Sequence, residues 1–291
     1  MRGVDSARAL DKTLYLHDGR TLGYAEYGIA DGQALFYFHG HPGARLEARF
    51  LAEQAMESGI RLIGIDRPGM GLSEFKAGRR LLDWPDDVSE LADSLRLDRF
   101  AVAGFSGGGP YALACAYKIP HRLIACGIVA GVGRTDPFRS FLSMWLPWLM
   151  LPVARRFFHN EAQARKSLTL AARRWTEPDR KSLLLPGISE LMAASLVEAL
   201  RQGSRGTAYD GTLLAGGRPW GFRLEDIAFP RLYLWHGELD KEVPVAGGRA
   251  VAGKLAHCNA TYYPGEGHIS LIVNHREEIV RTLIEKHQHI S

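Results

Sequence analysis

Ser106 has the clearest chemical potential in this 291-residue chain, because it lies in a Gly-Phe-Ser-Gly-Gly pentapeptide at residues 104–108. The apolar residues 99–103 before it are typical of a strand, and the glycines from Gly107 onward are typical of a helix start. A serine on such a strand-to-helix turn holds its hydroxyl outward, and flanking glycines avoid the contacts that a Cβ would make there. The pattern therefore predicts a nucleophilic serine.

A serine hydroxyl attacks a carbonyl only when a base accepts its proton and an acid orients that base. His268 follows a predicted strand in the glycine-flanked loop 264–268, and Asp240 follows the preceding strand in the loop 236–240. Loops after parallel strands lie at one edge of a sheet, where the turn around Ser106 is also expected. We therefore expect Ser106, Asp240 and His268 to form a catalytic triad.

Other interpretations of these residues stay open. Asp240 could cap a helix that begins near residue 243, in which case Glu238 or Asp136 would be the acid. His268 could be an ordinary loop histidine, as most of the 11 histidines must be.

A second glycine-rich turn, His-Gly-His-Pro-Gly at residues 39–43, follows the apolar run 34–38. Attack on a carbonyl needs two N–H donors for the oxyanion, and we expect the backbone N–H groups of Gly107 and His41 to supply them. Pro42 has no N–H to offer. The His41 imidazole could face the substrate, point to solvent or cap the loop.

The elements around these turns indicate an α/β fold. Continuous apolar runs at 34–38, 61–65 and 123–129 suit strands that are covered on both faces. Helical spacing separates them at 45–56 and 83–95, and this alternation predicts a doubly wound, mostly parallel sheet.

Residues 134–225 show no convincing parallel strand and are predicted to be helical. The alternation of strands and helices then resumes, with a strand at 231–235, a helix at 245–255, a strand at 260–263 and a helix at 271–286. We therefore expect one α/β core made of residues 1–133 and 226–291, with 134–225 as a helical insertion. Within the insertion, the apolar run 141–151 is too short and too broken by Pro147 to span a membrane. It could line a substrate pocket, pack on the core or anchor at an interface, and we expect Trp145 and Trp148 to contact substrate together with Phe105 and His41.

Composition excludes several classes of protein. The net charge of +4 is small for a nucleic-acid-binding protein, and no zinc-ligand spacing occurs. The three cysteines, Cys115, Cys126 and Cys258, lie in apolar segments and are expected to be buried thiols. Without an apolar leader in the first residues, we expect a cytoplasmic protein with no stable membrane insertion.

Five motifs in order resemble the α/β-hydrolase superfamily: the turn 39–43, Asp-Arg-Pro-Gly-Met-Gly-Leu-Ser at 66–73, the pentapeptide 104–108, the Asp240 loop with Val-Pro at 243–244, and Gly-Glu-Gly-His at 265–268. Asp66 itself is expected to be a turn-former. The resemblance covers residues 20–285 and implies an eight-stranded, mostly parallel sheet, a Ser-His-Asp triad, and a lid inserted after the sixth strand.

The resemblance and the residues together predict a serine hydrolase of a small, partly apolar carboxylic ester or lactone, which needs no cofactor and no metal. Hydrolysis of amides, thioesters or carbon–carbon bonds stays open, as does a catalytically silent receptor or scaffold on the same fold. A small-molecule substrate and no nucleic-acid partner are expected, and the chain could be a monomer or a homodimer.

Overall fold

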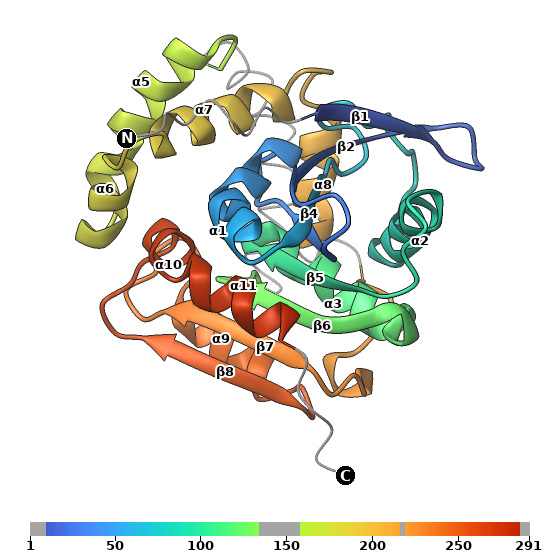
Figure 1. The fold of residues 1–291 in the computed structure, drawn as a ribbon. Coiled ribbons are helices and arrows are strands. Elements are labelled where there is room, and N and C mark those ends of the chain that lie inside the picture. The colour runs from blue at the N-terminus through green and yellow to red at the C-terminus, as the bar shows by residue number, and fades with distance from the viewer. Residues whose placement is uncertain (1–9, 134–157, 216–218, 286–291) are drawn as a thin grey trace.

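An eight-stranded sheet forms the centre of the computed structural model, which describes residues 10–133, 158–215 and 219–285 (Figure 1). The strand order is β1-β2-β4-β3-β5-β6-β7-β8. Strands β1 and β2 are antiparallel to their neighbours, whereas β4, β3, β5, β6, β7 and β8 are parallel. The predicted fold class is therefore confirmed. The strands are β1 (Leu10–Tyr15), β2 (Thr21–Gly28), β3 (Gln33–Phe38), β4 (Ile60–Ile65), β5 (Phe100–Phe105), β6 (Leu123–Val129), β7 (Leu232–Gly237) and β8 (Cys258–Tyr263).

Helices cover both faces of the sheet, which explains the continuous apolar runs. Along β3, Leu35 and Tyr37 face one hydrophobic cluster, while Phe36 and Phe38 face the other. The first cluster includes residues of α1 (Ala52–Glu57) and α11 (Arg276–Ile284), and the second includes residues of α2 (Trp84–Ser94), α3 (Gly109–Lys118) and α9 (Val245–Ala252).

Between β6 and β7 the described residues form no strand. They contain α5 (Glu161–Ala171), α6 (Glu177–Leu183), α7 (Ile188–Ala199) and α8 (Arg205–Leu214). Helix α6 packs against α10 (Ile269–Asn274) of the core (Figure 1). In the part of the chain that the structure describes, no helix alone has the length and apolar composition of a membrane span, and the pair α6 and α7 passes that test only together, across an 87° bend.

Three elements differ from the sequence-based expectation. The predicted helix 45–56 begins as a 3₁₀ helix (Arg45–Leu51) and continues as α1, and the closing helix 271–286 is two helices, α10 and α11, that meet at His275. Strand β1 was not predicted, because its sequence Leu-Asp-Lys-Thr-Leu-Tyr is half polar, as an edge strand with few neighbours allows.

Candidate active site

The turn around Ser106 joins β5 to α3 and holds the serine in a strained conformation. Ser106 has φ +50°, in the left-handed region that few residues with a Cβ adopt, and such a residue costs about 1–3 kcal/mol. The flanking glycines have a steric reason: a Cβ on Gly104 would lie 2.2 Å from the carbonyl oxygen of Gly108, and a Cβ on Gly108 would lie 2.1 Å from that of Phe38. The surrounding backbone therefore fits closely around this turn and presents Ser106 to the pocket described below.

Asp240 and His268 lie in contact at the carboxyl ends of β7 and β8. The Nδ1 atom of His268 is 2.7 Å from Oδ2 of Asp240, and both side chains are buried. The other carboxylate oxygen, Oδ1, accepts hydrogen bonds from the backbone N–H groups of Glu242 (2.9 Å) and Val243 (2.8 Å). The carboxylate is thus fixed by the loop that follows β7, and it can hold the imidazole with its Nδ1 protonated.

The environment of His268 favours its protonated form. Burial lowers the pKa of the imidazole, but the hydrogen bond that it donates to Asp240 and the negative charges of Asp240, Asp179 and Glu242 outweigh this effect, so the pKa is raised. The ring of Phe105 packs against the imidazole with 4.9 Å between ring centres. The histidine is thus confined between an aromatic ring and a carboxylate.

In the part of the chain that the structure describes, the carboxylate bonded to the His268 ring is that of Asp240 and not that of an alternative acid. Glu238 forms an ion pair with Arg249 at the surface, and Asp136 lies outside the described residues. A histidine that the sequence analysis did not single out, His236, lies behind Asp240 with its Nε2 3.5 Å from Oδ2 of Asp240 and 2.8 Å from the carbonyl oxygen of Val243. In the sequence, the feature that could have pointed to His236 is its place directly after the apolar run 231–235.

The turn 39–43 lies against the Ser106 turn. A Cβ placed on Gly107 would be 3.2 Å from the backbone nitrogen of His41, so the two expected oxyanion donors come from adjacent segments. Arg67 stabilises this turn, because its guanidinium donates hydrogen bonds to the carbonyl oxygens of His39 and Gly40.

Glu47 is a buried carboxyl group beside this turn that the sequence analysis missed. Its Oε1 accepts the N–H of Gly40 at 2.6 Å and the hydroxyl of Tyr37 at 3.1 Å. Burial raises the pKa of Glu47 to about 7, against the opposing effect of those hydrogen bonds and of Arg67. The available signal was a single acidic residue in the largely apolar segment 44–52.

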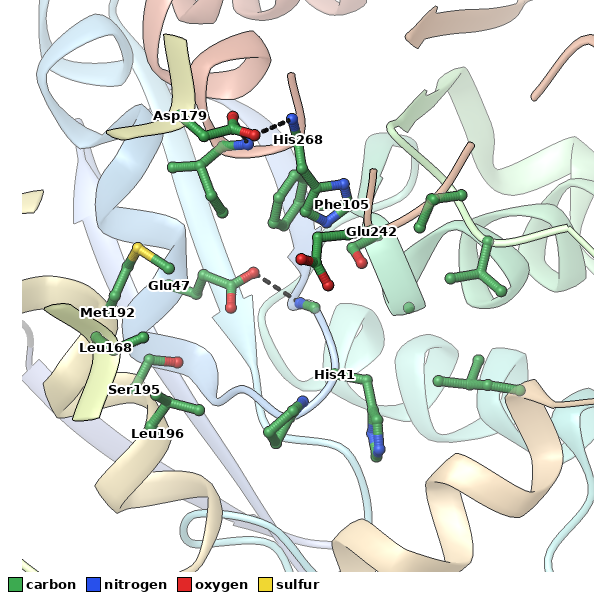
Figure 2. Close-up of a pocket in the computed structure, with 18 of the residues that line it drawn as sticks. His41, Glu47, Phe105, Leu168, Asp179, Met192, Ser195, Leu196, Glu242 and His268 are labelled. Carbon is green, nitrogen blue, oxygen red and sulfur yellow. Dashed lines mark hydrogen bonds between the residues drawn. The ribbon is translucent and has the colours of Figure 1, made fainter. Parts of the chain in front are cut away.

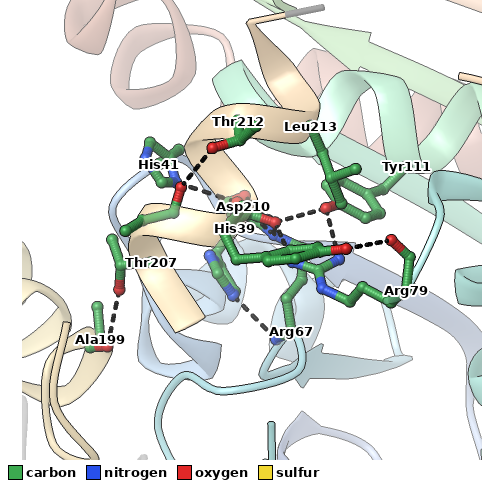
Figure 3. Close-up of polar contacts among 12 residues, drawn as sticks. His39, His41, Arg67, Arg79, Tyr111, Ala199, Thr207, Asp210, Thr212 and Leu213 are labelled. Carbon is green, nitrogen blue, oxygen red and sulfur yellow. Dashed lines mark hydrogen bonds and ion pairs between the residues drawn. The ribbon is translucent and has the colours of Figure 1, made fainter. Parts of the chain in front are cut away.

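The His41 imidazole joins a buried cluster of charges instead of standing free in the pocket (Figure 3). Its Nδ1 is 3.0 Å from Oδ2 of Asp210, a fully buried residue of α8. Asp210 also accepts hydrogen bonds from Arg67 (2.9 Å), Arg79 (2.6 Å) and the hydroxyl of Tyr111. Burial raises the pKa of Asp210, but Arg67, His41 and Arg79 lower it more, so it stays well below its usual range.

This cluster bears on two expectations. The sequence analysis left the His41 side chain open between substrate contact, solvent and a cap on the loop; the ring turns away from His268 in Figure 2 and bonds Asp210, although His41 still contributes to the pocket wall. The expected turn-forming role of Asp66 agrees with its Oδ2 accepting the N–H of Leu72 at 2.9 Å.

A pocket of about 450 Å³ joins these parts (Figure 2). Ser106, Gly107 and His268 lie along it with His41 and Phe105. The core and the segment between β6 and β7 both contribute to its apolar wall. The residues of this wall are Phe50, Val132, Leu168, Trp175, Met192, Leu196 and Leu214. Trp145 and Trp148, which the sequence analysis also expected here, lie outside the described residues. Within the described ranges, no group of three or more His, Cys, Asp or Glu side chains could hold a metal ion.

Comparison with solved structures extends the fold assignment. The chain superposes on an esterase from Thermogutta terrifontis with a TM-score of 0.72 at 20% identity, covering 94% of this chain and 97% of that one. It superposes on an enol-lactonase from Burkholderia xenovorans LB400 with a TM-score of 0.73 at 19% identity, covering 94% and 100%. These similarities show a shared fold.

Comparison of sequences identifies the family. A putative carbamate hydrolase from Caulobacter sp. (strain K31) is 36% identical over 90 residues, which cover 29% of this chain and 32% of that protein. The matched segments span about a third to two fifths of the length of the curated relatives. The model of the alpha/beta hydrolase family matches residues 35–282. Because that match takes in most of the sheet and the whole of the candidate site, the chain belongs to the alpha/beta hydrolase family.

Proposed function

We propose that this protein is a serine hydrolase that cleaves a carboxylic ester or lactone through an acyl-enzyme. One observation carries the proposal: His268, whose Nδ1 is 2.7 Å from the buried Asp240 carboxylate, lines the same pocket as Ser106 on its strained turn. An acid, an imidazole and an outward-held hydroxyl in one pocket are the parts that nucleophilic catalysis by serine needs.

In this mechanism Ser106 Oγ attacks the carbonyl carbon while Nε2 of His268 accepts its proton. Asp240 keeps the proton on Nδ1 and stabilises the imidazolium that forms. The N–H groups of Gly107 and His41 donate to the oxyanion, and each such donor contributes about 3 kcal/mol of transition-state stabilisation. His268 then protonates the leaving alcohol, and a water molecule activated by the same histidine releases the acid.

The pocket wall supports a small, partly apolar substrate. The side chains of Phe50, Leu168, Met192 and Leu196 offer an apolar surface for an acyl or alcohol group. Because α5 and α7 contribute part of this wall, we infer that residues 134–225 act as the predicted cap over the site. Two of the solved structures that share the fold are named as an esterase and an enol-lactonase, which agrees with an ester or lactone as the substrate class. A cytoplasmic location stays a prediction.

A fluorophosphonate probe tests the proposal directly, because it reacts with an activated serine and needs no knowledge of the substrate. We expect the folded protein to be labelled and Ser106→Ala to lose the label. Substitution of an exposed residue that does not line the pocket, Glu177→Gln, is the matched control and should label like the wild type. Failure of the folded wild-type protein to react would contradict the proposal and favour a catalytically silent binding protein.

Chain-length preference tests the pocket. With p-nitrophenyl esters from acetate to dodecanoate, we expect kcat/KM to rise beyond acetate and then to fall when the acyl chain exceeds a pocket of about 450 Å³. A preference confined to acetate would contradict an acyl-binding role for the apolar wall.

A further inference from the structure

Asp179 lies on α6, in the segment between β6 and β7, yet its carboxylate contacts the loop that carries His268 (Figure 2). Its Oδ2 accepts the backbone N–H of His268 at 3.1 Å, and its Oδ1 accepts those of Ile269 (2.8 Å) and Ser270 (2.9 Å). Three consecutive N–H groups, which have no partner within α10 itself, are thus bonded by one side chain.

The contact is buried and closely fitted. Asp179 is 3% exposed and His268 is 6% exposed. Thr176 donates its hydroxyl to Oδ2 of Asp179 at 2.6 Å, which orients the carboxylate. A Cβ on Gly267 would lie 2.2 Å from Oδ2 of Asp179 and 2.4 Å from the Thr176 hydroxyl oxygen, so only glycine there admits this approach.

From this geometry we propose that Asp179, which lies on the inserted helix α6, is a positioning residue for His268. The inference rests on the proposed hydrolase function and deepens it. Asp240 fixes the ring of His268 through Nδ1, and Asp179 fixes the backbone from which that ring extends. With ring and backbone both held, the imidazole has little freedom to leave the orientation needed for proton transfer.

Asp179 also acts on the charge of His268. The charged and titratable groups that face the imidazole are Asp240, Asp179, Glu242, Glu47 and His236. Among these, the negative charge of Asp179 raises the pKa of His268. A neutral side chain at this position therefore lowers the pKa of the histidine, a change that a purely structural role would not produce.

The substitution Asp179→Asn tests the proposal, with Glu177→Gln on the same helix as the matched control, because the Glu177 side chain is exposed and pairs with Lys181. For a p-nitrophenyl ester that the wild type hydrolyses, we expect Asp179→Asn to lower kcat about 10- to 100-fold with KM changed less than about twofold, as misplaced catalytic groups do. The acid limb of kcat/KM should move to lower pH. The control should match the wild type in kcat, KM and pH profile.

Folded Asp179→Asn protein with wild-type kcat and an unmoved acid limb would overturn the proposal. If Asp179→Asn does not fold, Thr176→Val keeps the charge and removes the hydroxyl that orients it; a severalfold loss of kcat in the folded variant is expected, and an unchanged kcat would overturn the proposal.

A readout independent of turnover separates this proposal from the proposed function. The proton between His268 Nδ1 and Asp240 should give a downfield ¹H NMR resonance in the wild type, assigned by its loss in Asp240→Asn. We expect Asp179→Asn to shift or broaden it and Glu177→Gln to leave it in place. An unshifted resonance in Asp179→Asn would count against the positioning role even if the wild type proved inert to fluorophosphonate.

Discussion

Negative charges surround His268 and favour its protonated form, whereas a general base must be neutral. Asp240 bonds its Nδ1 at 2.7 Å, and Asp179 and Glu242 add to the field around it. In the proposed mechanism these carboxylates stabilise the imidazolium that forms, but they also keep the resting histidine protonated at higher pH than usual. If His268 is the general base, the same residues are therefore expected both to lower the activation barrier and to restrict activity to higher pH.

This balance predicts the pH dependence. A general base must be neutral in the free enzyme, and the pKa of His268 is raised above its ordinary value of 6.5. We expect kcat/KM to fall as pH decreases, with a midpoint above 6.5. Rates measured between pH 5 and 9, on a substrate whose chemistry limits turnover, check this. An acid limb centred below 6.5 would mean that burial outweighs the carboxylates.

In the turn between β5 and α3, the packing of the backbone leaves no room for side chains at Gly104 and Gly108. The carbonyl oxygens of Phe38 and Gly108 lie where the Cβ atoms of Gly108 and Gly104 would be. Ser106 lies between these two closely packed glycines in the left-handed conformation.

A pair of glycine-to-alanine substitutions tests this fit. Gly104→Ala places a methyl group 2.2 Å from a backbone oxygen, and overpacking of this kind costs about 1–3 kcal/mol or more of unfolding free energy. We also expect it to abolish labelling of Ser106. Gly247→Ala, inside α9 with no atom within 4 Å of the added Cβ, should instead stabilise the protein by about 0.5–1 kcal/mol. Urea unfolding of both variants measures the difference, and equal effects would show that the turn tolerates a side chain.

At the scale of the whole molecule, buried charges join the segment between β6 and β7 to the core. Asp210 of α8 meets Arg67, Arg79 and His41, which come from three separate parts of the core. Close backbone contact supports the same junction, because a Cβ on Gly206 of α8 would lie 2.1 Å from the carbonyl oxygen of Gly69. Helix α8 is therefore a fixed support of the turn 39–43.

Removing the centre of this cluster should destabilise the fold strongly. Asp210→Asn leaves two buried arginines without their carboxylate, and breaking a buried ion pair in this way costs about 3–5 kcal/mol. Urea unfolding is the measurement. Glu177→Gln, which removes an exposed carboxylate paired with Lys181, should change stability little. A loss for Asp210→Asn no larger than that of the control would mean that the cluster contributes no net stability.

Much of the fold, and the residues of the proposed site, could be predicted from sequence alone. Strands β3 to β7 were expected near their observed positions, because strands covered on both faces read as continuous apolar runs, and β8 was expected at residues 260–263. Asp240 and His268 were chosen because loops after parallel strands share one edge of the sheet, and their contact agrees with that choice. These signals are local, and a local pattern can be read along the chain.

The contacts between residues far apart in the chain could be known only from the folded structure. Asp179 reaches the backbone of His268 across 89 positions, and Asp210 reaches His41 across 169. In sequence both are ordinary acidic residues of amphipathic helices. Their roles depend on how α6 and α8 pack on the core, and the free energy of a buried carboxylate depends on partners that come together only when the chain has folded. The sequence thus determined which residues could do chemistry, whereas the packing determined which residues hold them in place.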